Sequence, residues 1–186
     1  GSEKSGVLAS DPHLFEKHLV VICTNKDPSD IVKPSYAIAV CKIIQLWTQL
    51  GAQVIEMPMN EHDKVFAYTS HLPHLLAYSL VDTMAGEPEQ QAIFQFAAGG
   101  FRDFTRIAAS DPIMWRDIVQ SNKSNILNAL EEFTTGLSEL KSCIETDDYE
   151  RIMGIFTRAQ VARTRFQAIL TERSFQQNAF IVHNKT

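Results

Sequence analysis

The sequence NILNALEEFTTGLSELKSCI, from Asn125 to Ile144, carries the most regular pattern in this chain of 186 residues. Apolar side chains recur along it at alternating intervals of four and three residues, the spacing of a heptad repeat. These positions are Ile126, Leu130, Phe133, Leu137, Leu140 and Ile144. A helix with such a seam often packs against a second copy of itself, so the pattern predicts a helical bundle that forms a homodimer.

The sequence upstream of this seam is also predicted to be helical, beginning at about Asn60. Residues 62–85 form one long helix, and residues 89–98 form a short one. The short helix is expected to end at a turn made by Gly99 and Gly100, because glycine adopts unusual backbone angles at little cost.

Two further helix starts are visible. Asp111 and Pro112 suit the N-cap and the first position of a helix. Asp147, followed three residues later by Glu150, is typical of a capping box that opens a last long helix. The end of the chain, residues 174–186, has no clear period and is expected to be a tail or linker.

The first 58 residues have a different pattern, that of an α/β unit. A β-branched strand, His18–Thr24, precedes a helix at 36–50 that Ser35 caps and Gly51 ends, and a second strand follows at 52–57. Two strands are not a stable sheet by themselves, so this unit is expected to be the remnant of a larger α/β domain. The predicted domains are 1–58, 59–173 (helical) and 174–186, and the fold class is mainly α.

Composition excludes several classes of function. The net charge is −5 and no basic tract is present, so we expect no nucleic-acid partner. No apolar run is long enough for a membrane span, and the first residues lack the apolar core of a signal peptide. Three widely separated cysteines, Cys23, Cys41 and Cys143, indicate reduced, buried thiols in a cytoplasmic protein.

The stretch SHLPH, Ser70 to His74, is the first candidate site. On a helix His71 and His74 lie on one face, and Pro73 cannot donate a hydrogen bond to the carbonyl of Thr69, so the helix should bend there. Such a bend can point polar groups into a cleft. The alternative is that both histidines are satisfied core or interface residues. A metal-dependent hydrolase that adds His62 and Asp63 lacks the required ligand spacing, and we expect no metal site.

The second candidate site is GGFRDFTRIAASDPIMW, Gly99 to Trp115. Arg102 and Arg106 lie four residues apart with Asp103 between them. The planar fork of arginine matches a carboxylate, so a small acidic ligand is the natural partner. The alternative is a surface network of Arg and Asp, with Trp115 in the core.

These two motifs, together with GSEKSG at the start, resemble prephenate dehydrogenase, and the resemblance extends from Gly1 to about Arg173. It implies a helical dimerisation domain like the C-terminal domain of 6-phosphogluconate dehydrogenase, preceded by part of a Rossmann domain. The implied reaction is the NAD- or NADP-dependent oxidative decarboxylation of prephenate to 4-hydroxyphenylpyruvate in tyrosine biosynthesis, and tyrosine is a candidate inhibitor.

The resemblance also assigns residues. It places Arg106 on a substrate carboxylate, and it places His74, with His71 and Ser70 close by, in the substrate pocket. Ser2 and Glu3 are expected near the pocket mouth, and Asp103 and Trp115 near its dimer-related edge. The family's catalytic histidine belongs to an HPxxG motif directly before SEKSG, so it is expected upstream of Gly1.

No GxGxxG fingerprint occurs in this sequence, which leaves the cofactor-binding residues unknown. We therefore expect the chain to be folded, dimeric and inactive by itself, with no strong binding of NAD or NADP. Two alternatives remain open. One is an arogenate-preferring dehydrogenase, and the other is a non-catalytic helical module for dimerisation or regulation.

Overall fold

The computed structural model describes residue 7, residues 10–24 and residues 34–183. The chain divides into two compact units, Gly1–Leu130 and Glu131–Thr186, and each is described by itself. The domain boundaries expected from the sequence, at residues 58 and 173, stay predictions. No helix of the described residues is long and apolar enough to cross a membrane.

The first unit begins with the predicted α/β elements. Strand β1 (Leu19–Thr24) pairs in parallel with β2 (Gln53–Pro58), and α2 (Pro34–Gln49) connects them. Gly51, with a φ of 82°, makes the left-handed turn after α2, as predicted. The assignment of Ser35 as N-cap was wrong: α2 already includes Pro34, whose missing N–H suits the first turn of a helix.

The three cysteines are free, as expected, but only Cys143 is buried. Cys23 and Cys41 are exposed, which corrects the expectation of three buried thiols. Cys23 lies on the two-stranded sheet and Cys41 on α2, a helix with no buried residue. In this chain too little packs over these elements to cover their side chains.

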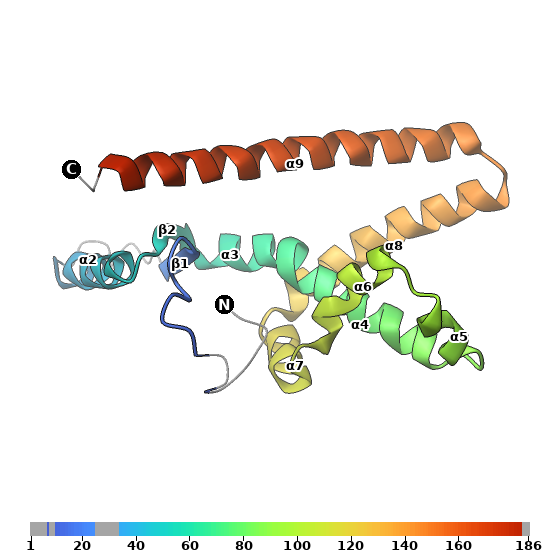
Figure 1. Ribbon diagram of the computed structural model, residues 1–186, viewed down its shortest axis with the longest axis horizontal. Coiled ribbons are helices and arrows are strands. Elements are labelled where there is room, and N and C mark those ends of the chain that lie inside the picture. Colours follow the sequence, from blue (N-terminus) through green and yellow to red (C-terminus); the bar gives the residue numbers. More distant parts are fainter. Residues whose placement is uncertain (1–6, 8–9, 25–33, 184–186) are drawn as a thin grey trace. The chain divides into compact units, whose positions relative to one another are not determined.

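The predicted long helix is present as three consecutive segments that form one path (Figure 1). They are α3 (Met59–Phe66), a π-helical turn η2 (Ala67–His71) and α4 (Leu72–Ala85). In η2 the N–H of Leu72 donates to the carbonyl of Ala67, five residues back instead of four. The irregularity that Pro73 predicts is therefore an inserted wide turn immediately before the proline.

The Gly-Gly segment differs from its prediction. Helix α5 (Gln90–Gln95) ends before the glycines, and Gly99 and Gly100 are the first residues of α6 (Gly99–Thr105), which the short helix η3 (Arg106–Ala109) continues. Neither glycine has a positive φ, and a Cβ at either position would meet nothing within 4 Å. The turn assigned to them was wrong. Both α6 and η3 lie against α4 (Figure 1).

Helix α7 (Pro112–Ser121) begins as predicted: one carboxylate oxygen of Asp111 accepts from the N–H groups of Ile113 (2.8 Å) and Met114 (3.1 Å). Helix α8 (Lys123–Glu145) contains the heptad seam. Its first turns complete the core of the unit, where Ile126 and Ala129 pack with Ala67 of η2.

In the second unit, α9 runs from Tyr149 to His183, so most of the expected tail is helical. The capping box at Asp147 was wrong. Asp147 has a φ of 55° and forms the turn, whereas the carboxylate of Asp148 caps α9 by accepting from the N–H of Arg151 at 3.0 Å. An ion pair between Arg151 and Glu139 (2.9 Å) joins the two helices beside this turn.

Candidate functional site

Two elements of the first unit bring the candidate histidines together. His71 is the last residue of the π-turn η2, and His74 is the third residue of α4. Both side chains are half-buried, and both rings contact Trp115 of α7. The predicted pair therefore faces one buried aromatic side chain from a helix that is distant in sequence.

The ring of His74 has two defined contacts. Its Nδ1–H donates to the carbonyl of Ser70 at 2.9 Å, so Nδ1 carries a proton. The ring stacks on Trp115 with centroids 3.8 Å apart and an interplanar angle of 20°. Together these contacts fix the orientation of the ring, and Nε2 is the nitrogen left for an outside group.

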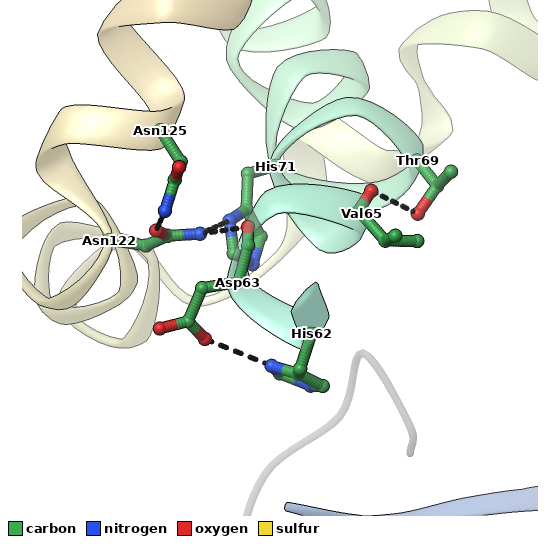
Figure 2. A network of polar contacts seen from close by, with 7 residues as sticks. All are labelled: His62, Asp63, Val65, Thr69, His71, Asn122 and Asn125. Carbon is green, nitrogen blue, oxygen red and sulfur yellow. Dashed lines mark hydrogen bonds and ion pairs between the residues drawn. The ribbon is translucent and has the colours of Figure 1, made fainter. Parts of the chain in front are cut away.

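His71 is held by a buried amide, that of Asn122, at the junction of α7 and α8 (Figure 2). The Nδ2 of Asn122 lies 3.2 Å from Nδ1 of His71 and 2.7 Å from the backbone carbonyl of Asp63. Its Oδ1 accepts from Nδ2 of Asn125 at 2.8 Å. The π-turn is thus tied to α8 through side chains.

The surroundings of His71 disfavour its charged form. Burial lowers the pKa of this imidazole, and the neighbouring rings of His62 and His74 lower it further, while the carboxylate of Asp63 acts in the opposite direction. The net shift is downward from the ordinary value of 6.5. His71 is therefore a neutral imidazole at pH 7.

Trp115 was predicted both as a site residue and, alternatively, as a core residue. The structure buries it, with 6% of its surface exposed, and places it against the rings of both histidines. Its indole N–H has no hydrogen-bond partner among the described residues, and neither does the buried hydroxyl of Ser110. The buried hydroxyls of Thr24 and Tyr36 also have no partner among the described residues, so such atoms do not by themselves mark a ligand site.

A tyrosine attaches the segment after η3 to α4. The hydroxyl of Tyr78 donates to the carbonyl of Ser110 at 2.7 Å. Burial and the nearby carboxylate of Asp111 raise the pKa of this phenol, so it keeps its proton and remains a donor. This bond fixes where η3, which begins with Arg106, lies along α4.

The arginines of the second motif are on the surface. Arg106 is exposed at the start of η3. Arg102 and Asp103, both with side chains 80% exposed, form a loose ion pair at 3.8 Å. The element that carries Arg106, η3, packs against α4, the helix that carries His74. A screened pair such as Arg102 and Asp103 adds little stability.

The remaining predicted residues are placed as follows. Ser70 is half-buried in η2 and supplies the carbonyl that orients His74. Ser2 and Glu3 lie outside the described residues. His62 bonds to Asp63 at 3.0 Å and stacks on Phe66. Within residues 10–24 and 34–183, no group of three His, Cys, Asp or Glu side chains is arranged to hold a metal ion.

Sequence reasoning missed Asn122. It stands in the polar stretch SNKSN, which looks like an ordinary connection between two helices. Its partner His71 lies 51 residues earlier in the chain, so no local spacing connects them. The only local signal is a break between helices rich in side chains that form hydrogen bonds with backbone groups.

Comparison with known proteins identifies the family. The family model described as "Prephenate dehydrogenase, dimerization domain" matches residues 58–158, more than half of the chain. The chain belongs to the prephenate dehydrogenase family. The matched segment contains both candidate motifs and the predicted heptad seam.

Individual relatives agree with this assignment. Prephenate dehydrogenase of Bacillus subtilis is 37% identical over 161 residues, which are 86% of this chain and 42% of that protein. Cyclohexadienyl dehydrogenase of Zymomonas mobilis is 35% identical over 165 residues, which are 88% of this chain and 54% of that protein. The chain thus spans about half the length of these relatives.

A solved prephenate dehydrogenase has a similar structure. It is the Aquifex aeolicus enzyme in complex with hydroxyphenyl propionate and NAD+, with a TM-score of 0.75 and 38% identity. The similarity covers 89% of this chain and 56% of that one. The predicted family and fold class, a helical dimerisation domain preceded by a small parallel strand-helix-strand unit, are therefore confirmed.

Proposed function

We propose that this chain is the substrate-binding and dimer-forming part of an enzyme that oxidises prephenate with NAD+ or NADP+. The observation that carries the proposal is the family match over residues 58–158. The ligands of the Aquifex relative add support, because hydroxyphenyl propionate has a phenol ring and a carboxylate, as does 4-hydroxyphenylpyruvate.

The reaction removes a hydride from the ring carbon that bears the hydroxyl group and transfers it to the nicotinamide. The hydroxyl group gives up its proton to a base, and the ring carboxylate leaves as CO2 as the ring becomes aromatic. A proton then returns to the phenolate oxygen, which gives the phenol of the product. Because aromatisation drives the reaction, the enzyme mainly has to orient its substrate. We assign orientation, not proton abstraction, to the residues of this chain.

In this proposal Arg106 binds a substrate carboxylate through its guanidinium fork. His71, His74 and Ser70 line the pocket, with Trp115 behind the two rings. Asp103, Ser2 and Glu3 belong to its edge. The proton acceptor and the nucleotide-binding residues are assigned to other parts of the enzyme, since the sequence has no GxGxxG loop.

The dimer is also a proposal. Helices α8 and α9 expose large apolar side chains, including Leu137 (53%), Ile144 (61%) and Phe156 (55%). We propose that a second copy of the chain covers them, because the matched family model describes a dimerization domain. The free cysteines support a reducing compartment, the cytoplasm, as the location.

The test is an assay of the complete enzyme that contains this chain. Prephenate is supplied with NAD+ and, separately, with NADP+, and formation of the reduced nucleotide and of CO2 is followed. We expect equal amounts of both products. Arogenate in place of prephenate tests the closest alternative, and tyrosine is added as a candidate inhibitor.

The chain by itself is expected to form no reduced nucleotide with either substrate. Product formation by the isolated chain would contradict the division of roles proposed here. Failure of the complete enzyme on both substrates would favour the non-catalytic dimerisation or regulatory module.

A further inference from the structure

The buried amide of Asn122 has only one acceptable orientation. A backbone carbonyl can only accept, so the atom of Asn122 that lies 2.7 Å from the carbonyl of Asp63 must be Nδ2. On the other side of the amide, Oδ1 accepts from Asn125. This orientation is therefore determined by the partners (Figure 2).

The same orientation determines which nitrogen of His71 carries the proton. The Nδ2 group has two hydrogens; one is used by Asp63, and the other points to Nδ1 of His71 at 3.2 Å. A proton on Nδ1 would place two donors against each other, so Nδ1 must accept. Neutral His71 then carries its hydrogen on Nε2.

His74 has the opposite arrangement. Its Nδ1–H donates to the carbonyl of Ser70, so in the neutral ring Nε2 holds a lone pair. The two rings both contact Trp115, but their Nε2 atoms differ. Nε2 of His71 is a hydrogen-bond donor, and Nε2 of neutral His74 is an acceptor. Sequence spacing alone cannot distinguish them.

We propose that Asn122 is a positioning residue that fixes His71 as a neutral Nε2–H donor, leaving His74 as the acceptor of the pair. His71 would then hydrogen-bond a ligand oxygen and take no proton from the substrate. The proposal rests on the proposed function only for the identity of that ligand. The assignment of the ring protons of His71 and His74 does not depend on the enzyme being active.

Three features favour this positioning role over a purely structural one. Asn122 is buried, with 7% of its surface exposed, so its hydrogen bonds are shielded from competing water. It contacts the site residue His71 directly. The carbonyl of Asp63 already accepts from the N–H of Ala67, so the helix does not need Asn122 to satisfy that oxygen.

The first test is nitrogen-15 NMR of the histidine rings in this chain at neutral pH, where protonated and unprotonated ring nitrogens have well-separated shifts. We expect His71 to show an unprotonated Nδ1 and a protonated Nε2, and His74 to show the reverse. A protonated Nδ1 on His71 in the unmodified chain would overturn the proposal, and this measurement requires no variant.

Variants test whether Asn122 is the cause. Asn122→Leu removes the amide at similar volume, and we expect His71 to become a mixture of tautomers while His74 keeps its pattern. Asn128→Leu is the matched control, because Asn128 is an exposed asparagine of α8, the helix that begins directly after Asn122. An unchanged His71 pattern in a folded Asn122→Leu chain would contradict the assigned role.

Kinetics of the complete enzyme connect the proton arrangement to the ligand. Loss of one oriented hydrogen bond in Asn122→Leu should raise KM for prephenate about 10-fold, with kcat changed by less than about 2-fold. If KM is unchanged although the tautomer of His71 is altered, the proposed hydrogen bond from His71 to the substrate is wrong. An inactive unmodified enzyme would instead count against the proposed function and leave the NMR result standing.

Discussion

The two candidate histidines acquire different properties from their hydrogen-bond partners, one of which is near in the sequence and one distant. His71 and His74 have the same side chain on one helical path, yet Asn122 and the carbonyl of Ser70 give their rings opposite proton arrangements. A neutral histidine at pH 7 that cannot easily gain a proton affects stability as well as binding.

This predicts a pH dependence of folding. The pKa of His71 is below that of the unfolded chain, so between these two values the unfolded state binds more protons, and stability must fall as pH falls below about 6.5. The charged or titratable groups around it are His62, Asp63 and His74. Urea unfolding of the chain and of His71→Gln, between about pH 7.5 and about pH 5.5, measures how much unfolding free energy each loses on acidification. The variant should lose less stability.

His13 provides a control of opposite sign. Its hydrogen bond to Glu16 raises its pKa, so its contribution is present below about pH 6.5 and disappears as pH rises through the higher folded value. His13→Gln should therefore change the slope of the unfolding free energy against pH only above about pH 6.5. Equal acid loss in the chain and in His71→Gln would show that His71 is not the responsible group.

Among the elements, α7 illustrates how local chemistry fixes a boundary. Asp111 accepts two backbone N–H groups, and Pro112 occupies the first position, where no N–H is needed. The helix start in turn sets where Trp115 meets the histidines.

Asp111→Ala should therefore cost about 1 kcal/mol of unfolding free energy, because two donors lose their partner. Asp117→Ala is the matched control: Asp117 lies on the same helix, exposed and paired with Arg116 at 2.7 Å. Surface pairs of this kind are worth about 0 to 1 kcal/mol. Denaturant titrations of both variants provide the comparison, and a smaller effect at Asp111 than at Asp117 would refute the capping argument.

Local sequence signals predicted some element boundaries correctly and others wrongly, as the caps assigned to Ser35 and Asp147 show. The Asp111 cap and the Gly51 turn follow from residues next to them, and both were correct. Pro73 predicted an irregularity but not its form, since a π-turn depends on which carbonyls find donors. Gly99 and Gly100 were misassigned because nothing in their own sequence shows that a helix can start there.

The site shows the same division. The proximity of His71 and His74 could be predicted because they share one helix face, whereas their role in a substrate site, and that of Trp115, stays a prediction. The tautomers could not be predicted, because Asn122 reaches His71 across 51 residues. The heptad seam predicted the helix but not which of its apolar residues are buried within the chain. Ile126 is in the core, whereas Leu137 and Ile144 are exposed.

For the whole molecule, those exposed positions predict the assembly. If a second copy covers the seam, Leu137→Asp places a charge in a buried apolar contact and should convert the dimer to monomer at micromolar concentration. Analytical ultracentrifugation measures this. Ser138→Asp, one position away from the seam and also exposed, should remain dimeric. A Leu137→Asp chain that is still dimeric would exclude this face as the interface.

The central claim, that this chain supplies the substrate-binding part of a prephenate dehydrogenase, is tested most directly at Arg106. In the complete enzyme, Arg106→Ala should lower kcat/KM for prephenate by roughly 10- to 100-fold, mainly through KM, since a charge-assisted contact is worth about 1.5–3 kcal/mol. Arg102→Ala, which removes another exposed arginine one turn earlier, should change kcat/KM by less than about 3-fold. Equal effects of the two substitutions, or none from Arg106→Ala, would contradict the account.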